Sequence, residues 1–200
     1  MGYGGRPRKF ERDGALETAM LLFWEHGFEQ TGIDDLAKAM RISTSSLYST
    51  FGDKRQLFLE ALDLYRSGRG GYTKTTLEVG GSALDSFRRL FETAARELTR
   101  GDQPRGCMLT LSLPTFSQGL EELQVEVSRR RAESLDGFRK RLARAKREKD
   151  LPPFVDVNLL ASFLMTTLMG MSLQARSGAS RSHLLKIGEL ALQAWPGARP

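Results

Sequence analysis

Apolar residues recur every three or four positions along almost the whole of this 200-residue chain. That spacing places them on one face of an α-helix, and no alternating run is long enough to predict a β-strand. Glycine and proline interrupt the pattern between segments. We therefore predict an all-α fold, with helices at about 13–26, 31–40, 44–51, 53–66, 82–100, 106–117, 120–149, 155–176 and 181–195.

Three helix ends in the N-terminal part carry recognisable signals. Gly27 can supply the left-handed residue that stops the first helix, and Phe28 can then fold back on Phe23. Thr31–Asp34 reads Thr-Gly-Ile-Asp, which predicts a capping box that opens the second helix. Asp53–Gln56 gives a similar signal for the fourth helix.

The net charge of +6 does not by itself indicate a nucleic-acid partner. Residues 129–149 hold ten Lys/Arg and three Asp/Glu, whereas residues 1–58 hold eight of each sign. A basic run of this kind is usually a solvated helix face. The excess positive charge therefore lies mainly outside the N-terminal helices.

Composition places the chain among globular proteins. An apolar share of 40% is enough for a packed core. No run of apolar residues reaches the roughly 18 that a membrane span needs, and no apolar signal-peptide core follows the basic N-terminus. The single cysteine cannot form an internal disulfide, which fits a reducing compartment. We take the cytoplasm as the working location and expect no membrane partner.

The second and third predicted helices have the pattern of a helix-turn-helix, in which two short helices share an apolar seam and the second has a polar outer face. The seam is predicted from Leu36, Ala37, Met40, Ile42, Leu47 and Phe51, packed on Phe23. The outer face carries Thr44, Ser45, Ser46, Ser49 and Thr50. Small hydroxyls can approach base edges and also bond phosphates. On the pattern alone, three amphipathic helices more often make a plain helical bundle.

The amino-acid identities in three stretches are more specific than the apolar pattern. Residues 15–28 read ALETAMLLFWEHGF, Thr31 precedes IDDLA at 33–37, and residues 46–54 read SLYSTFGDK. Together they resemble the N-terminal domain of the TetR family, without a gap from Arg12 to Phe58. The resemblance implies an all-α homodimeric transcriptional regulator, expected to be a repressor, with a helix-turn-helix DNA-binding domain and a helical ligand-binding and dimerisation domain. Its implied partners are a palindromic double-stranded DNA operator, a second copy of the chain and a small-molecule effector of unknown identity.

The resemblance also implies a division of the chain. We expect a flexible basic arm at 1–10, the helix-turn-helix domain at 11–52, a connecting helix at 53–70, the effector-binding and dimerisation domain at 71–196, and a tail at 197–200. Ser67–Gly71 holds three glycines in five residues, which predicts a loop or hinge after the connecting helix.

Several positions match those with which family members contact DNA. The resemblance implies that Tyr48 and Lys54 reach phosphate oxygens, and that Thr31 touches the DNA backbone as well as capping its helix. The residues that would read bases are Thr44, Ser45, Ser46 and Thr50. Arg6, Arg8 and Lys9 would lie along the backbone or in the minor groove, unless this arm is simply disordered.

The sequence departs from the family pattern at two positions. Arg41 stands in the turn where glycine is common, and a left-handed conformation there would cost roughly 1 kcal/mol. Thr50 stands where histidine is common, which leaves the preferred operator undetermined.

The C-terminal part offers candidates for an effector pocket. The set comprises Phe87, Phe91, Cys107, Met108, Leu111, Phe116, Phe163, Met165 and Met169. A residue of this kind taken singly is more often part of an ordinary core. Gly106–Cys107 resembles the start of the sixth helix in one branch of the family, some members of which sense electrophiles or oxidants. A thiol there beside Arg105 could react, or it could be a small core residue. Pro114 predicts that the helix kinks or ends near Leu113.

The last two predicted helices are the most apolar. In the family, two such helices pair with their symmetry mates as a four-helix dimer interface. The residues we expect at that interface are Leu160, Leu164, Leu168, Ile187, Ala191 and Trp195. An isologous dimer would present two half-sites roughly 34 Å apart.

Two other functional classes compete with a ligand-responsive regulator. An enzyme is disfavoured because no nucleophile elbow or phosphate loop is present, and the two histidines and one cysteine are too far apart in sequence to predict a metal site. We therefore expect neither catalytic residues, nor a metal, nor a cofactor. The alternative is an architectural DNA-binding protein without an effector, although its body would be longer than dimerisation requires.

Overall fold

The computed structural model describes residues 6–112 and 118–197, with side chains from residue 12 onward. These residues form α-helices and no strand, which confirms the predicted all-α fold. The helices are α1 (Arg6–Gln30), α2 (Ile33–Met40), α3 (Thr44–Phe51), α4 (Lys54–Ser67), α5 (Tyr72–Glu78), α6 (Ala83–Glu97), α7 (Met108–Leu111), α8 (Glu121–Arg147), α9 (Val157–Arg176) and α10 (Arg181–Gln193).

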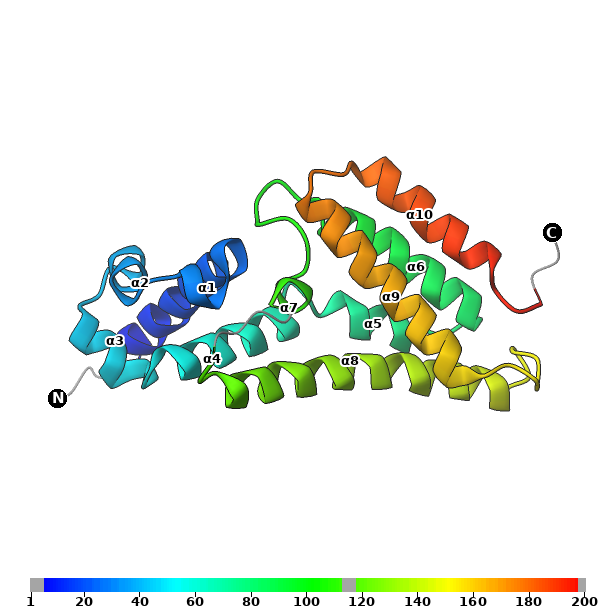
Figure 1. The fold of residues 1–200 in the computed structure, drawn as a ribbon, viewed down its shortest axis with the longest axis horizontal. Helices are drawn as coiled ribbons and strands as arrows, with labels where there is room; N and C mark the ends of the chain where they lie inside the picture. The colour runs from blue at the N-terminus through cyan, green and yellow to red at the C-terminus, as the bar shows by residue number, and fades with distance from the viewer. Residues whose placement is uncertain (1–5, 113–117, 198–200) are drawn as a thin grey trace.

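The helices form two groups joined by α4 (Figure 1). Helices α1, α2 and α3 gather at one end of the molecule, and α4 runs from them toward a larger body made of α5 to α10. The buried side chains form two clusters, one around α1–α4 and one within the body. The first cluster also takes in Met108 of α7 and Leu123 and Val127 of α8, so the N-terminal unit is packed against the body.

The first helix differs from the prediction at both ends. It begins at Arg6 instead of about Asp13, so the backbone that we expected to be a flexible arm is helical from that residue on. At the other end Gly27 has a φ of 81°, and helical backbone resumes beyond it as far as Gln30. The rings of Phe23 and Phe28 stack with their centroids 6.2 Å apart, as the sequence predicts. Residues 1–5 lie outside the described part of the chain.

The start of α2 corrects the capping prediction. Gly32 is the N-cap, and no side chain caps the helix. Thr31 instead donates its hydroxyl to the carbonyl of Gly27 at 2.6 Å, and only 2% of the residue is exposed. Its hydroxyl closes the turn after the Gly27 kink. The cap at α4 is confirmed, because the carboxylate of Asp53 accepts the backbone N–H of Gln56 at 2.8 Å.

Two short helices differ from the prediction. Helix α5 occupies part of the segment between the predicted hinge and 82, where no helix was expected. Helix α7 covers only Met108–Leu111 of the predicted 106–117, and Pro114 lies outside the described residues.

Helix α9 is long and apolar enough to cross a membrane by length and composition alone, and no other helix among the described residues is. This corrects the expectation that no run is that long, since residues 157–174 carry no charged side chain. In the fold α9 contacts α6, α7, α8 and α10. A single such helix is weak evidence for a membrane span, because the core helix of a soluble protein passes the same test.

Candidate DNA interface and ligand cavity

The turn between α2 and α3 has the left-handed geometry that the pattern requires. Arg41 has φ 58° and ψ 39°, and the backbone N–H of Ile42 bonds the carbonyl of Ala37 at 3.0 Å. A side chain in this conformation costs roughly 1 kcal/mol relative to glycine. The turn is therefore built as it would be with glycine, and Arg41 is exposed.

Helix α3 separates an apolar inner face from a polar outer face. Leu47 and Phe51 are 0% and 2% exposed, which confirms the seam on this helix. The hydroxyl of Ser43 caps the helix by accepting the N–H of Ser46 at 3.1 Å. This cap was missed by our sequence analysis, although a serine directly before the first apolar-periodic residues is the usual signal. The outer positions Ser45, Ser46, Tyr48, Ser49 and Thr50 are exposed and Thr44 is half-buried.

Tyr48 and Lys54 lie close together in sequence at the junction of α3 and α4. Tyr48 is 49% exposed. The Nζ atom of Lys54 lies 4.5 Å from the centroid of the Phe28 ring, an arrangement in which the ring face attracts the cation. Burial lowers the pKa of Lys54, and the nearby charge of Glu29 opposes that shift. Tyr48 is therefore open to solvent, whereas the ammonium of Lys54 rests against an aromatic ring of α1.

Arg12 of α1 links the end of α3 to α4. Its guanidinium carbon lies 4.6 Å from the centroid of the Phe51 ring, and its Nη2 pairs with Glu60 of α4 at 2.6 Å. Sequence analysis did not identify this bridge, because Arg12 and Glu60 are brought together only by the packing of α1 on α4. Arg6, Arg8 and Lys9 occupy the first turns of α1, with their side chains outside the described part.

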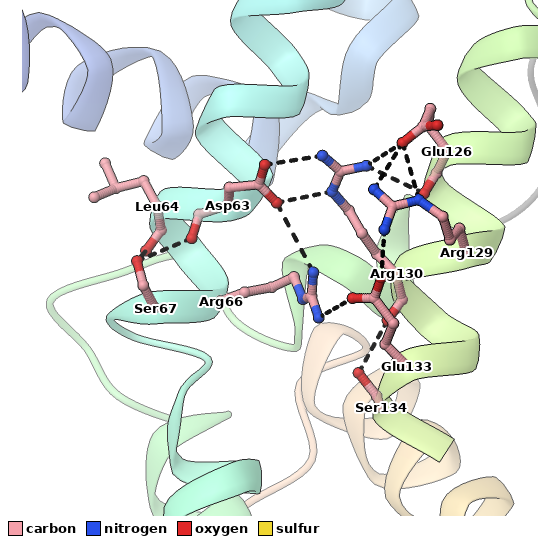
Figure 2. A network of polar contacts seen from close by, with 9 residues as sticks. All are labelled: Asp63, Leu64, Arg66, Ser67, Glu126, Arg129, Arg130, Glu133 and Ser134. Atoms are coloured by element: carbon pink, nitrogen blue, oxygen red, sulfur yellow. Dashed lines mark hydrogen bonds and ion pairs between the residues drawn. The ribbon is translucent and has the colours of Figure 1, made fainter. Parts of the chain in front are cut away.

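A network of charged side chains joins α4 to α8 (Figure 2). Arg130 of α8 has a side chain only 6% exposed and binds both carboxylate oxygens of Asp63 of α4, at 2.8 and 2.9 Å. It also binds Glu126 at 2.8 Å. Arg66 of α4 binds Glu133 of α8 at 2.8 Å. The hydrogen bonds of Arg130 to Asp63 and Glu126 raise the pKa of Arg130 despite its burial, and the bond to Asp63 has the larger effect.

The body contains a cavity of about 1020 Å³ between α8 and the segments around α5 and α9. Of the predicted pocket residues, Cys107, Met165 and Met169 line it. Phe87, Phe91 and Met108 do not, because they are at most 2% exposed and fill the two cores. Leu111 packs against the N-terminal core, Phe163 is 42% exposed on the outside, and Phe116 lies outside the described residues.

Cys107 sits where the two cores meet. It is half-buried and packs against both clusters, and its backbone N–H donates to the hydroxyl of Ser172 at 2.8 Å. Burial raises the pKa of Tyr65 and of Tyr72, with the neighbouring Cys107 adding to both shifts. The structure shows no bond between Arg105 and the Cys107 thiol, one of the two arrangements that the sequence left open. The Arg105 guanidinium instead bonds the carbonyls of Ala175 and Ala179 at the end of α9.

The outer face of α9 and α10 differs from the predicted dimer interface. Leu160, Leu164 and Trp195 are at most 8% exposed and belong to the core of this same chain. Leu168, Ile187 and Ala191 are partly buried against that core. The exposed apolar residues on these helices are Leu159, Phe163, Leu173 and Leu190, at 69%, 42%, 52% and 66%. The spacing of apolar residues predicts two apolar helices here, but it does not show which side of each helix the core of the same chain covers.

The comparisons with known proteins agree with this architecture. The family described as bacterial regulatory proteins, tetR family, matches residues 15–61. The HTH-type transcriptional repressor ComR of Escherichia coli (strain K12) is 33% identical over 193 residues, covering 96% of this chain and 92% of that protein. The chain belongs to the TetR family. An uncharacterized HTH-type transcriptional regulator of Bacillus subtilis (strain 168), YezE, is 29% identical over 181 residues, covering 90% and 93%.

A solved TetR-family structure matches nearly the whole chain. A cysteine mutant of the transcriptional regulator CifR, in complex with 26 bp of double-strand operator DNA, has a TM-score of 0.91 and 38% sequence identity. The match covers 96% of this chain and 100% of that one. The chain is thus a TetR-family transcriptional regulator and not an enzyme, with its helix-turn-helix in α2 and α3.

Proposed function

We propose that this TetR-family regulator is a repressor that binds a palindromic operator as a homodimer and is released when an effector enters the cavity. The observation that carries the DNA-binding part is the exposed hydroxyl face of α3 with Tyr48 and Lys54 at its end. The similarity to a regulator solved on its operator supports this role.

The proposed DNA contacts are those that the family resemblance implies. Tyr48 and Lys54 bind phosphates, which fixes the register of α3 in the major groove. Thr44, Ser45, Ser46 and Thr50 face the base edges, and Arg6, Arg8 and Lys9 extend the contact along the backbone. Thr31, with its hydroxyl bonded inside the turn, contributes by holding the start of α2 in place.

The exposed apolar face of α9 supports an isologous dimer. Leu159, Phe163 and Leu173 lie within an arc of about 80° when residues are placed at helical spacing, and Leu190 adds to the surface from α10. A large apolar patch on a soluble protein marks an interaction surface. A second copy of the same face would cover it and place two α3 helices in successive major grooves.

Footprinting on the DNA that flanks the gene tests the proposal. The expected result is one protected palindrome, with two chains per duplex by light scattering. Smeared protection without a preferred site would instead support an architectural DNA-binding protein and would contradict operator recognition.

The release step is proposed to act through α4. An occupied cavity would shift α4, which carries the DNA-binding unit, so that the two α3 helices lose the spacing of their half-sites. If operator affinity stays unchanged when the cavity is filled, this coupling is wrong.

Chemical modification of the Cys107 thiol is the second proposed cause of release from DNA. The half-buried thiol lines the cavity and packs against both cores, so an adduct there would disturb their contact. Under this form of the proposal Cys107→Ser abolishes release by an oxidant, and a response that survives the substitution excludes it.

A further inference from the structure

The wall of the cavity holds more cations than anions. The cationic residues in it are Arg66, Lys74, Arg131, Lys140, Arg141 and Arg144, and the acidic ones are Glu78, Glu133 and Asp136. Part of this excess is neutralised by pairing, through Arg66–Glu133, Lys74–Glu78, Lys140–Asp136 and Arg144–Glu148. The remaining cations are Arg131 and Arg141, for which the described part of the chain supplies no ion pair.

Arg131 is the accessible member of this pair. It is half-buried in α8, where burial lowers its pKa. Arg141 is 4% exposed and is held by the Ser86 hydroxyl and the Gly81 carbonyl, at 3.1 and 2.7 Å, while its Nη1 has no partner among the described residues. A partly desolvated cation without a counter-ion is unfavourable, and an anion bound beside it removes that cost.

The rest of the wall is suited to a hydrocarbon or an aromatic group. Its apolar residues are Leu77, Leu98, Leu109, Leu135, Met165, Leu168 and Met169, and the rings of Tyr65 and Tyr72 join them. The two methionines come from α9, where flexible thioether side chains can adapt to different ligand shapes.

We propose that the cavity binds an anionic amphiphile, whose acidic group pairs with Arg131 and whose apolar part lies against the leucine and methionine wall. The geometry assigns the charge of the effector and one residue that recognises it. Only the consequence of binding, the release of DNA, rests on the proposed function.

Binding without DNA tests the ligand class separately from operator release. Octanoate and octan-1-ol share a hydrocarbon chain and differ in charge, so calorimetric titration of the full chain with each isolates the acidic group. Octanoate is expected to bind about tenfold or more tightly than octan-1-ol, as a charge-assisted hydrogen bond implies. Equal affinity for the two, or no binding of octanoate at millimolar concentration, would overturn the proposal.

Two variants identify the recognising cation. Arg131→Gln should weaken octanoate binding about tenfold and leave octan-1-ol unchanged. Arg144→Gln is the matched control, because it removes the same charge from the same wall where the arginine already pairs with Glu148. If both variants weaken octanoate equally, Arg131 is not the anchor. If the ligand results hold but footprinting shows no operator, the proposed function fails and the ligand class stands.

Discussion

Arg130 of α8 and Asp63 of α4 form a two-point ion pair, with Nε–Oδ1 and Nη2–Oδ2 distances of 2.8 and 2.9 Å. The pair joins α4, which follows the helix-turn-helix, to α8 (Figure 2), and residues of α8 line the cavity. Because Arg66 of α4 and Glu133 of α8 both line that cavity and pair with each other, the charged network borders the proposed ligand site.

Removing one member of this pair should loosen α4. Asp63→Ala leaves the buried Arg130 with Glu126 alone, and we expect a loss of about 1–2 kcal/mol in the free energy of unfolding, reduced from a fully buried pair because Asp63 is half-exposed. Urea denaturation measures this loss. Asp136→Ala removes an exposed pair with Lys140, which solvent screens, and should cost much less. Equal effects of the two substitutions would contradict a special role for Asp63.

The phosphate contacts should be visible in the salt dependence of operator binding. Lys54→Ala should weaken binding to all sequences and lower the slope of log affinity against log salt by about one. Tyr48→Phe should weaken binding without changing that slope, since it removes a hydroxyl and no charge. Lys74→Ala removes an exposed lysine on α5, a helix that lies away from α3 (Figure 1), and serves as the control. A slope that is the same in the Lys54 variant and the wild type rules out its phosphate contact.

The outer face of α9 should hold the dimer together. Phe163→Glu places a charge in the proposed apolar interface, so light scattering should report a monomer at concentrations where the wild type is a dimer. Val125→Glu introduces the same charge on α8, where Val125 is 65% exposed, and should leave the dimer intact. A dimeric Phe163 variant would place the interface elsewhere.

Tyr65 and Tyr72 should make the fold sensitive to alkali. Burial raises the pKa of Tyr65 and Tyr72 well above the ordinary value of 10.0, so the unfolded chain loses these protons first. Their contribution to stability is complete below pH 10.0 and is lost as the pH rises toward the folded-state values. Denaturation midpoints measured across this range should fall with pH, and replacing both tyrosines by phenylalanine should flatten the fall. An unchanged slope in the double variant would contradict this origin.

The packing of α10 on α6 depends on Gly188. A Cβ atom added there would lie 2.7 Å from the Cβ of Phe91, so Gly188→Ala should cost about 1–3 kcal/mol by overpacking. Gly14→Ala is the matched control, because a Cβ in α1 at that position meets nothing within 4 Å and should stabilise the helix by about 0.5–1 kcal/mol. Calorimetric melting of both variants checks the two signs.

Several local features of this protein could be predicted from the sequence, although the caps of α2 and α3 were not. Helical periodicity, the positive φ of Gly27, the cap at Asp53 and the seam through Leu47 and Phe51 each depend on residues that are near one another in the chain. The same holds for the family resemblance, because it rests on one contiguous segment. The tetR-family match to residues 15–61 confirms that prediction.

Only the tertiary structure decided which faces of the helices are covered. Phe87 and Leu160 have the same apolar character as Met165 and Phe163, yet the first two fill the core while Met165 lines the cavity and Phe163 is exposed. Likewise, Arg105 donates a hydrogen bond to a carbonyl of α9, and Arg130 pairs with Asp63, which is 67 positions away in the sequence. Hydrophobicity is non-directional, so periodicity predicts that a face will be buried but not by which partner. Ion pairs of this kind exist only after packing has brought the helices together.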